Sequence, residues 1–577
     1  MSYHQTHKSN WIHSEYWVAV VSSIIGALGV WYVYSLGLVK ELTDAHAHLN
    51  FSKMLFESLT PGVSQIGYWP PLLHVLMAPF TQIPSLYETG LAGAVVILPF
   101  YVLGSVFCYK LVKLMTGNSV LSWSGAFLFM LNPYVIYYTA TPMMEVMFLG
   151  NLMGVAYFIA SWMYKGRLID LIGTGIFVML ATLARYEGII LVPLVAMIIV
   201  AELIRRRRQF SEIQATVLLF VMVGAIGIGT IISYSWIFGG NPLAFMGGEW
   251  IRSADANSTN IRTEGNIFST FQYLLHASYY MIGQNLIWFA AICLPFLFAI
   301  AKNRLQVLAV LSVLISPLLF IALALYQGSY NVAVPDLSPW NIFLNERYGL
   351  AWIGFVIISP MLLIGAVLRM ESITRWVKYS GYVTAAAAIT VLMYATADNL
   401  YTVAKTDKFF IVRNNINTPR ASQEELAAFL GERYDFGKVL LTRADNDPVL
   451  SEAGIPLHSY IYEANFRYFE QSLDEPWIFA RWVVMHNPDD QKDQWSVNNE
   501  NVARRWAGNE QFEHFYELVY ENTKRRVYKI NDERVVAYAE ENNFDLSQIP
   551  SVNREMGKWN PLDFYNKLQV SVSVKKN

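Results

Sequence analysis

Long, uncharged apolar runs dominate the first 400 residues of the chain. A helix that crosses a bilayer needs about 20 apolar residues, so each such run is a candidate span. The pattern predicts about eleven membrane-spanning helices, at residues 16–39, 91–113, 119–138, 143–164, 168–184, 188–204, 213–237, 277–301, 306–326, 349–368 and 380–397. The first run is too long for the core of a signal peptide, so we expect it to be retained as a helix.

The remaining residues, 401–577, have the charge density of an ordinary soluble protein. The whole chain is 54% hydrophobic and only 15% charged, against about 25% charged residues in soluble domains. Short apolar runs at 439–442 and 482–485 and an alternating pattern at 526–530 are typical of strands. The capping-box pattern Ser422 to Glu425 predicts a helix at 423–432. We therefore expect a polytopic α-helical membrane domain at 1–399 and an α/β domain at 400–577.

Basic residues collect in alternate short connections between the predicted spans. These residues are Lys110, Lys113, Lys165, Arg167, Arg205 to Arg208, Lys302, Arg304, Arg369, Arg375 and Lys378. Short loops rich in Lys and Arg stay cytoplasmic. This distribution predicts a multi-pass plasma-membrane protein with a cytoplasmic N-terminus. An odd number of spans then makes the C-terminal domain extracytoplasmic.

The predicted outward loops are the longer ones, at residues 40–90, 238–276 and 327–348. Long loops that a rigid scaffold positions often carry function. Polar residues collect at this outer rim, whereas a transporter more often has polar breaks near the middle of its helices. The pattern favours a reaction at the outer interface. A lipid or solute transporter, and a non-catalytic membrane assembly subunit, remain alternatives.

The first outward loop contains Asp44 shortly after the first predicted span. We expect a helix at 45–58, which Thr60, Pro61 and Gly62 end, and a second short helix near Pro71. The carboxylate of Asp44 suits two roles: it can accept a proton from a hydroxyl nucleophile, or it can cap the helix.

The same loop has three histidines, His46, His48 and His74, which raise the alternative of a divalent metal. Asp44 and His48 have the i, i+4 spacing that puts two side chains on one helix face. Because no second compact ligand pair is visible, the metal is not favoured. Tyr68 and Trp69 suit the headgroup depth of a membrane.

Four charged residues lie near the outer ends of other predicted spans. Glu145 is an ionisable group at membrane depth, which is a costly position, and it either serves the site or pairs with a nearby arginine. Arg185 and Glu187 flank a tight turn between two short spans, where they either neutralise each other or leave Arg185 to face a phosphate. Arg347 is an equal candidate for a phosphate.

The first loop resembles that of the GT-C membrane glycosyltransferases. Its pattern is Asp44-Ala-His-Ala-His48-Leu, then Pro61-Gly62 and Gly67-Tyr-Trp-Pro-Pro-Leu-Leu-His74. The class includes protein O-mannosyltransferases, lipid A aminoarabinose transferases and catalytic subunits of oligosaccharyltransferase. The layout of many spans, an early acidic residue and a C-terminal outer domain is also similar over essentially the whole chain.

The resemblance implies transfer of a sugar from a polyprenyl-phosphate donor to a hydroxyl of a glycan, lipid or protein. Asp44 would then be the catalytic base and Glu145 a second catalytic acid. The residues expected to contact substrate are His46, His48, Tyr68, Trp69, His74, Arg185, Glu187 and Arg347. Two departures narrow the class: Asp44 is followed by alanine where O-mannosyltransferases have glutamate, and the Trp-Trp-Asp signature of oligosaccharyltransferase is absent. These favour transfer of a single sugar.

Overall fold

The computed structural model describes residues 11–67, 69–243, 245, 263–337, 343–369, 421–443, 446–490 and 500–557, with a few further positions between 390 and 400. The chain forms two compact units. We call residues 1–41, 68–76 and 90–416 the helical unit, and residues 42–67, 77–89 and 417–577 the mixed unit.

The helical unit is built of apolar helices. Their bounds are α1 Trp11–Ser35, α5 Leu91–Thr116, α6 Ser119–Met130, α7 Pro133–Ala140, α8 Glu145–Lys165, α9 Leu168–Ala184, α10 Leu191–Arg205, α11 Phe210–Gly224, α12 Ile226–Gly239, α14 Ile267–Ile282, α15 Gln284–Ile300, α16 Arg304–Tyr326 and α17 Ile353–Leu368. The short 3-10 helices η2 (Tyr186–Ile190) and η4 (Glu346–Leu350) precede α10 and α17. Six helices of the described residues are long and apolar enough to cross a membrane, or up to nine spans if each bent pair counts as one. These helices support a membrane location.

Three predicted spans are each broken into two helices. The run 119–138 is divided into α6 and α7, which are bent by 57°. Here the Asn132 side chain accepts from the backbone amides of Tyr134 and Val135, and Pro133, which has no N–H, starts the new helix. The run 213–237 is bent by 49° between α11 and α12, and α14 and α15 are bent by 114° around Gly283.

The count of eleven spans stays a prediction. The run predicted at 168–184 forms α9, which has 17 residues and is shorter than the six helices that are long enough to cross a membrane. The last predicted span, 380–397, lies almost wholly outside the described residues. The orientation of the termini also stays a prediction.

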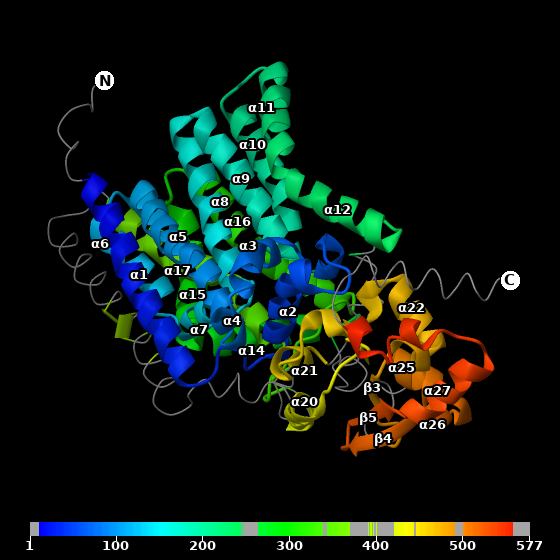
Figure 1. Cartoon of the computed structure of the whole chain (residues 1–577). Helices are drawn as coiled ribbons and strands as arrows, with labels where there is room; N and C mark the ends of the chain where they lie inside the picture. The colour runs from blue at the N-terminus through cyan, green and yellow to red at the C-terminus, as the bar shows by residue number, and fades with distance from the viewer. Residues whose placement is uncertain are drawn as a thin grey trace. The chain divides into compact units, whose positions relative to one another are not determined.

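Helix α8 is the centre of the helical unit. The apolar stretch of α8 is 94% buried inside the protein, and α5, α9 and α16 pack against it. Figure 1 shows α8, α9 and α16 running side by side. A helix that is apolar on all sides and surrounded by other helices is a fixed scaffold, so the ends of α8 are well-held positions for polar groups.

The mixed unit contains a five-stranded sheet of order β2-β1-β3-β5-β4. Its strands are β1 Val439–Leu440, β2 Tyr460–Ile461, β3 Trp482–His486, β4 Tyr516–Glu521 and β5 Arg525–Ile530. Strand β1 pairs in parallel with β2 and β3, whereas β5 is antiparallel to β3 and β4. The predicted runs 439–442, 482–485 and 526–530 thus correspond to β1, β3 and β5.

The helices of the mixed unit come from both ends of the chain. The N-terminal ones are α2 Thr43–Glu57, η1 Val63–Ile66 and α4 Pro84–Glu88, while α3 Leu72–Thr81 contributes to both units. The C-terminal ones are α20 Ala421–Arg433, α21 Asp447–Glu452, η6 Leu457–Ser459, η7 Glu463–Asn465, α22 Arg467–Asp474, α23 Pro476–Phe479, α25 Asn501–Trp506, α26 Glu510–Phe515, α27 Asp532–Glu541, η8 Leu546–Gln548 and η9 Arg554–Gly557. The predicted helices at 45–58, near Pro71 and at 423–432 are confirmed as α2, α3 and α20.

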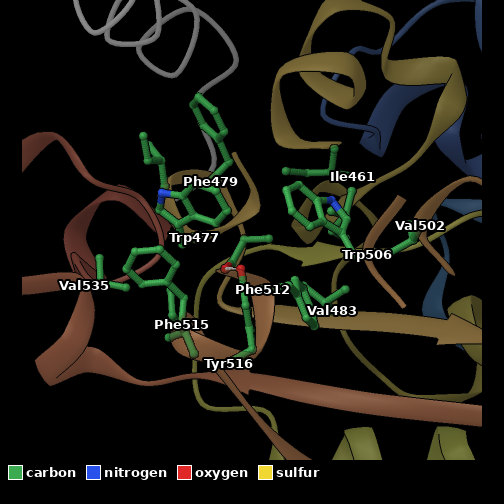
Figure 2. Packing of buried hydrophobic residues seen from close by; sticks show 14 of the residues in the cluster. Ile461, Trp477, Phe479, Val483, Val502, Trp506, Phe512, Phe515, Tyr516 and Val535 are labelled. Carbon is green, nitrogen blue, oxygen red and sulfur yellow. Dashed lines mark hydrogen bonds between the residues drawn. The ribbon is translucent and has the colours of Figure 1, made fainter. Parts of the chain in front are cut away.

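Both faces of this sheet are covered by apolar side chains. Alternate residues of β3 enter different cores: Val483 and Met485 join one cluster, and Trp482 and Val484 join the other. In the first cluster, Trp477 stacks on Phe515, with ring centroids 4.7 Å apart. Figure 2 shows these two side chains among their apolar neighbours. The second cluster includes Met54 of α2. The first-loop helix is therefore part of the core of the mixed unit.

Candidate functional site

Glu145 is the first residue of α8 and is only 6% exposed. A carboxylate in the first turn of a helix is stabilised by the helix dipole, but a buried carboxylate also needs a partner. Oε1 of Glu145 accepts a hydrogen bond of 2.7 Å from Nη1 of Arg185. The prediction that Glu145 meets a nearby arginine is therefore confirmed.

Arg185 connects two glutamates. It ends α9 in an extended conformation, and the turn that follows is closed by Gly188, where any Cβ would lie 2.5 Å from the backbone nitrogen of Thr182. Besides Glu145, it donates to Glu187 through Nε and Nη2, the shortest of these bonds being 2.7 Å. The fork geometry of a guanidinium suits this paired contact. The alternative in which Arg185 and Glu187 neutralise each other is thus confirmed, and Arg185 contacts Glu145 as well.

Arg347 approaches the same carboxylate from another part of the chain. Its Nε lies 3.3 Å from Oε1 of Glu145, and its side chain is 8% exposed. It belongs to η4, which packs so closely on α14 that a Cβ at Gly349 would lie 2.4 Å from the backbone of Ala277. Only glycine fits at this position. We call Glu145, Arg185, Glu187 and Arg347 the Glu145 cluster. Its two carboxylates and two guanidinium groups balance in formal charge.

Aromatic rings line the Glu145 cluster. The ring of Tyr348 faces both guanidinium groups, with Cζ of Arg185 at 5.5 Å and Cζ of Arg347 at 5.9 Å from its centroid. Tyr348 in turn stacks on Tyr330, with centroids 5.0 Å apart. A cation close to a ring face is stabilised by the ring quadrupole, so these tyrosines help to hold the arginines in place.

Several buried polar atoms beside the cluster are unsatisfied. Oε2 of Glu145, the hydroxyl of Tyr138 and Oγ1 of Thr141 have no hydrogen-bond partner among the described residues. Tyr138 is fully buried and interacts electrostatically with Glu145, Glu346 and Arg347. Buried polar atoms are normally paired, and each exception calls for an explanation. The hydrogen bonding around the Glu145 cluster is therefore incomplete among the described residues.

Asp44 is in the mixed unit, whereas the Glu145 cluster is in the helical unit. It is half-buried and stands in the first turn of α2. The helix begins at Thr43 with Leu42 as its N-cap, which makes no side-chain capping bond. The alternative of Asp44 as an N-cap is therefore wrong, because the helix starts one residue before it. Its role as a base stays a prediction.

The three histidines of the first loop are buried. Nδ1 of His46 is 2.6 Å from Oγ of Ser451, and Nδ1 of His74 is 3.1 Å from the carbonyl oxygen of Pro70. Within the described residues, no group of three or more His, Cys, Asp or Glu side chains is arranged to hold a metal ion. Trp69 is half-buried in the helical unit, and Tyr68 lies outside the described residues.

Three residues beside the Glu145 cluster were not predicted: Tyr138, Thr141 and Tyr348. They are uncharged, so they do not interrupt the hydropathy pattern as the charged candidates do. A signal was nevertheless present. Tyr348 directly follows Arg347, and Tyr138 and Thr141 lie just before Glu145, so proximity to the charged candidates would have indicated all three.

The fold is similar to that of two solved membrane enzymes. One is ArnT from Cupriavidus metallidurans bound to undecaprenyl phosphate, with 13% identity, a TM-score of 0.51, and coverage of 89% of this chain and 98% of that one. The other is the Archaeoglobus fulgidus oligosaccharyltransferase in complex with Zn and sulfate, with 12% identity, a TM-score of 0.50, and coverage of 92% and 74%. No protein-family model matches, and neither does any curated protein sequence. At these identities the likeness shows the fold alone.

Proposed function

On the premise that the chain has the fold of the GT-C membrane glycosyltransferases, we propose that it transfers one sugar from a polyprenyl-phosphate donor to an acceptor hydroxyl. The acceptor belongs to a glycan, lipid or protein, and the reaction takes place at the outer face of the cell membrane. The bound undecaprenyl phosphate of ArnT supports a donor of this chemistry.

The observation that carries the proposal is the incomplete hydrogen bonding of the Glu145 cluster. Oε1 of Glu145 is held by Arg185, while the buried Oε2 has no partner among the described residues. A carboxylate oxygen so placed can accept a hydrogen bond from a sugar hydroxyl, and this bond gains strength when water is excluded. Glu145 would thus orient the donor sugar.

The two arginines take different roles in this proposal. Arg185 uses Nε, Nη1 and Nη2 on the two glutamates, so it fixes the geometry of the cluster. Arg347, which reaches the same carboxylate from η4, is the proposed ligand of the donor phosphate. A cation there stabilises the dianion that develops as the bond to the sugar breaks, an effect worth about 2.7–4 kcal/mol for one well-placed group.

The chemical step is a substitution at the anomeric carbon. The acceptor oxygen forms a bond to this carbon, and the bond from the carbon to the phosphate oxygen breaks. The electron pair of that bond leaves with polyprenyl phosphate, and Asp44 takes the proton of the attacking hydroxyl. A positioned base of this type contributes about 10²–10⁴-fold to the rate.

Reconstitution in liposomes with undecaprenyl-phosphate sugars tests the proposal. We expect sugar transfer in the wild type and a loss of about 100-fold in Asp44→Asn. Glu424→Gln is the matched control because Glu424 is also an acid in the first turn of a helix of the mixed unit, and it should retain full activity. Unchanged transfer in Asp44→Asn would remove the base role. Movement of the lipid across the membrane without transfer would instead indicate a flippase.

A further inference from the structure

The carboxyl ends of the parallel strands in the mixed unit are occupied by the first loop. Ligands of open α/β sheets bind at this edge, where the chain leaves parallel strands. Here β1 is followed by Asp447, whose carbonyl and carboxylate oxygens accept from Nδ2 of Asn50 in α2 at 2.9 and 3.0 Å. Strand β2 is followed by Tyr462, which also contacts the first loop. The edge that would hold a ligand thus holds α2 and η1.

A buried hydrogen-bond network joins Tyr462 to the loop. Its hydroxyl donates to Oε1 of Gln65 at 2.7 Å and lies 3.0 Å from Oγ of Ser58. Burial raises the pKa of Tyr462 to about 12, so the hydroxyl keeps the proton that it donates. Because Ser58 and Gln65 lie on either side of the Thr60-Pro61-Gly62 break, one side chain fixes both halves of the loop.

Asn465 adds a second point of attachment. Its Nδ2 donates to Oγ of Ser58 at 3.2 Å and to Oγ1 of Thr60 at 3.0 Å. Its Oδ1 accepts from the backbone amide of Tyr462 at 3.0 Å, which locks the two residues together. Ser58, Gln65, Tyr462 and Asn465 are each fully buried. Water therefore cannot replace any lost bond, and the loop has one preferred position.

We propose that Tyr462 and Asn465 are positioning residues, which hold the first loop and thereby Asp44 for sugar transfer. The mixed unit then serves the reaction by fixing the base at the start of α2. The catalytic part of this inference rests on the proposed function; the holding of the loop does not.

The test compares two tyrosine-to-phenylalanine variants of the full-length protein. Tyr462→Phe removes the two bonds of the Tyr462 hydroxyl to the loop and leaves those of Asn465. Tyr516→Phe removes a bond of equal burial, from the Tyr516 hydroxyl to the carbonyl oxygen of Ala480 at 2.6 Å, that does not touch the loop. We expect Tyr462→Phe to lower kcat about 10-fold with KM for the lipid donor within twofold. Amide hydrogen exchange in peptides covering residues 45–66 should be at least about 10-fold faster. Tyr516→Phe should change neither.

Equal kcat in the two variants, or equal exchange of residues 45–66, would overturn the positioning role. A fall in melting temperature alone would also overturn it, because a merely structural bond affects the amount of folded enzyme and not its kcat. If Tyr462→Phe does not fold, Asn465→Ala provides the same comparison. If the wild type transfers no sugar, the proposed function fails. Faster exchange in Tyr462→Phe would then still support the holding of the loop, and unchanged exchange would overturn that as well.

Discussion

Two buried glutamates of the helical unit, Glu145 and Glu202, each contact a pair of arginines, yet their surroundings differ. Glu202 accepts from Arg205 through both carboxylate oxygens, at 2.8 and 2.6 Å, and from Nε of Arg206 at 2.6 Å. The arginines come from the same stretch of chain as the glutamate, three and four residues on, and are 50% and 25% exposed. This ion group is local in sequence, and it is complete in that both carboxylate oxygens of Glu202 accept hydrogen bonds.

Glu145 has partners that are distant in sequence and buried. Arg185 and Arg347 come from the end of α9 and from η4, and their side chains are 12% and 8% exposed. Only Oε1 is engaged, since Oε2 has no partner among the described residues. Removing charges from water costs several kcal/mol per ion. An ion group with an unpaired oxygen forms fewer hydrogen bonds and therefore offsets less of this desolvation cost. In the proposed function, the donor sugar completes this group.

The two ion groups also contact opposite ends of α8, although Glu202 itself belongs to α10. Glu145 starts α8, whereas Arg206 donates to the carbonyl oxygen of Met163 near its other end. Eighteen residues of helix span about 27 Å, close to the thickness of the hydrocarbon core. The group around Glu202 fits the basic anchors predicted for the cytoplasmic side, and the Glu145 cluster fits the predicted outer rim.

Neutralising the two glutamates should give the largest contrast. We expect Glu145→Gln to lower kcat/KM for sugar transfer at least about 100-fold, equivalent to about 2.7 kcal/mol of transition-state stabilisation, because the amide weakens the bonds to the sugar and to Arg185. Glu202→Gln should leave kcat/KM within about twofold. Both are measured in liposomes, per amount of folded protein.

Melting temperatures serve as the control for this pair. Glu202→Gln removes a complete ion group, so it should be the more thermally destabilised of the two. Equal loss of activity per folded molecule in both variants would contradict the distinction between complete and incomplete clusters.

Substituting Arg347 and Arg185 should have smaller effects, which separate binding of the donor from the geometry of the Glu145 cluster. Lysine keeps the charge but cannot form the two-pronged contact of a guanidinium. We expect Arg347→Lys to raise KM for the polyprenyl-phosphate donor about 10-fold. Arg185→Lys, which loses its paired contact with Glu187, should lower kcat by a similar factor and change KM little. Steady-state kinetics over a range of donor concentrations distinguish the two.

The opposite pattern, with KM raised only in Arg185→Lys, would exchange the two roles. Arg205→Lys is the matched control from the complete group, and it should alter neither constant. A change in donor KM there would mean that charge anywhere on the bundle affects lipid binding.

Much of the helical unit could be predicted from sequence because burial in a bilayer demands long apolar runs. Glu145, Arg185, Glu187 and Arg347 stood out for the same reason, as charges that interrupt such runs. The breaks were missed: apolar content continues through Asn132 and Gly283, so hydropathy alone reads a bent pair of helices as one span.

The grouping of the first loop with the mixed unit could not be predicted. The bonds from Tyr462 and Asn465 to Ser58 connect residues about 400 positions apart, and no local pattern encodes such a pairing. The alternative of Asp44 as a helix cap failed for a smaller reason. Helix boundaries from sequence are uncertain by a few residues, and the observed helix starts two residues before the predicted one, which puts Asp44 in the first turn.

Lys438 and His458 of the mixed unit offer the smallest test. It distinguishes side chains that act on stability from those that act on the reaction. Nζ of Lys438 donates to the carbonyl oxygen of His458 at 2.8 Å. Burial and the charge of Lys438 lower the pKa of His458 to about 4 from its usual 6.5. The folded protein resists protonation of the His458 ring. The contribution of the neutral ring to the free energy of unfolding is therefore complete above pH 6.5 and is lost as the pH falls toward 4.

We expect this titration to lower the free energy of unfolding by about 1–2 kcal/mol between pH 6.5 and 4, after allowance for partial exposure. The melting temperature of the wild type should fall over this range, and His458→Gln should flatten the curve. The exposed His514 is the control, since His514→Gln should keep the wild-type slope. Transfer activity per folded molecule should be equal in all three proteins, because His458 acts on stability. A fall in kcat of His458→Gln at constant fold would instead connect this buried pair to the reaction.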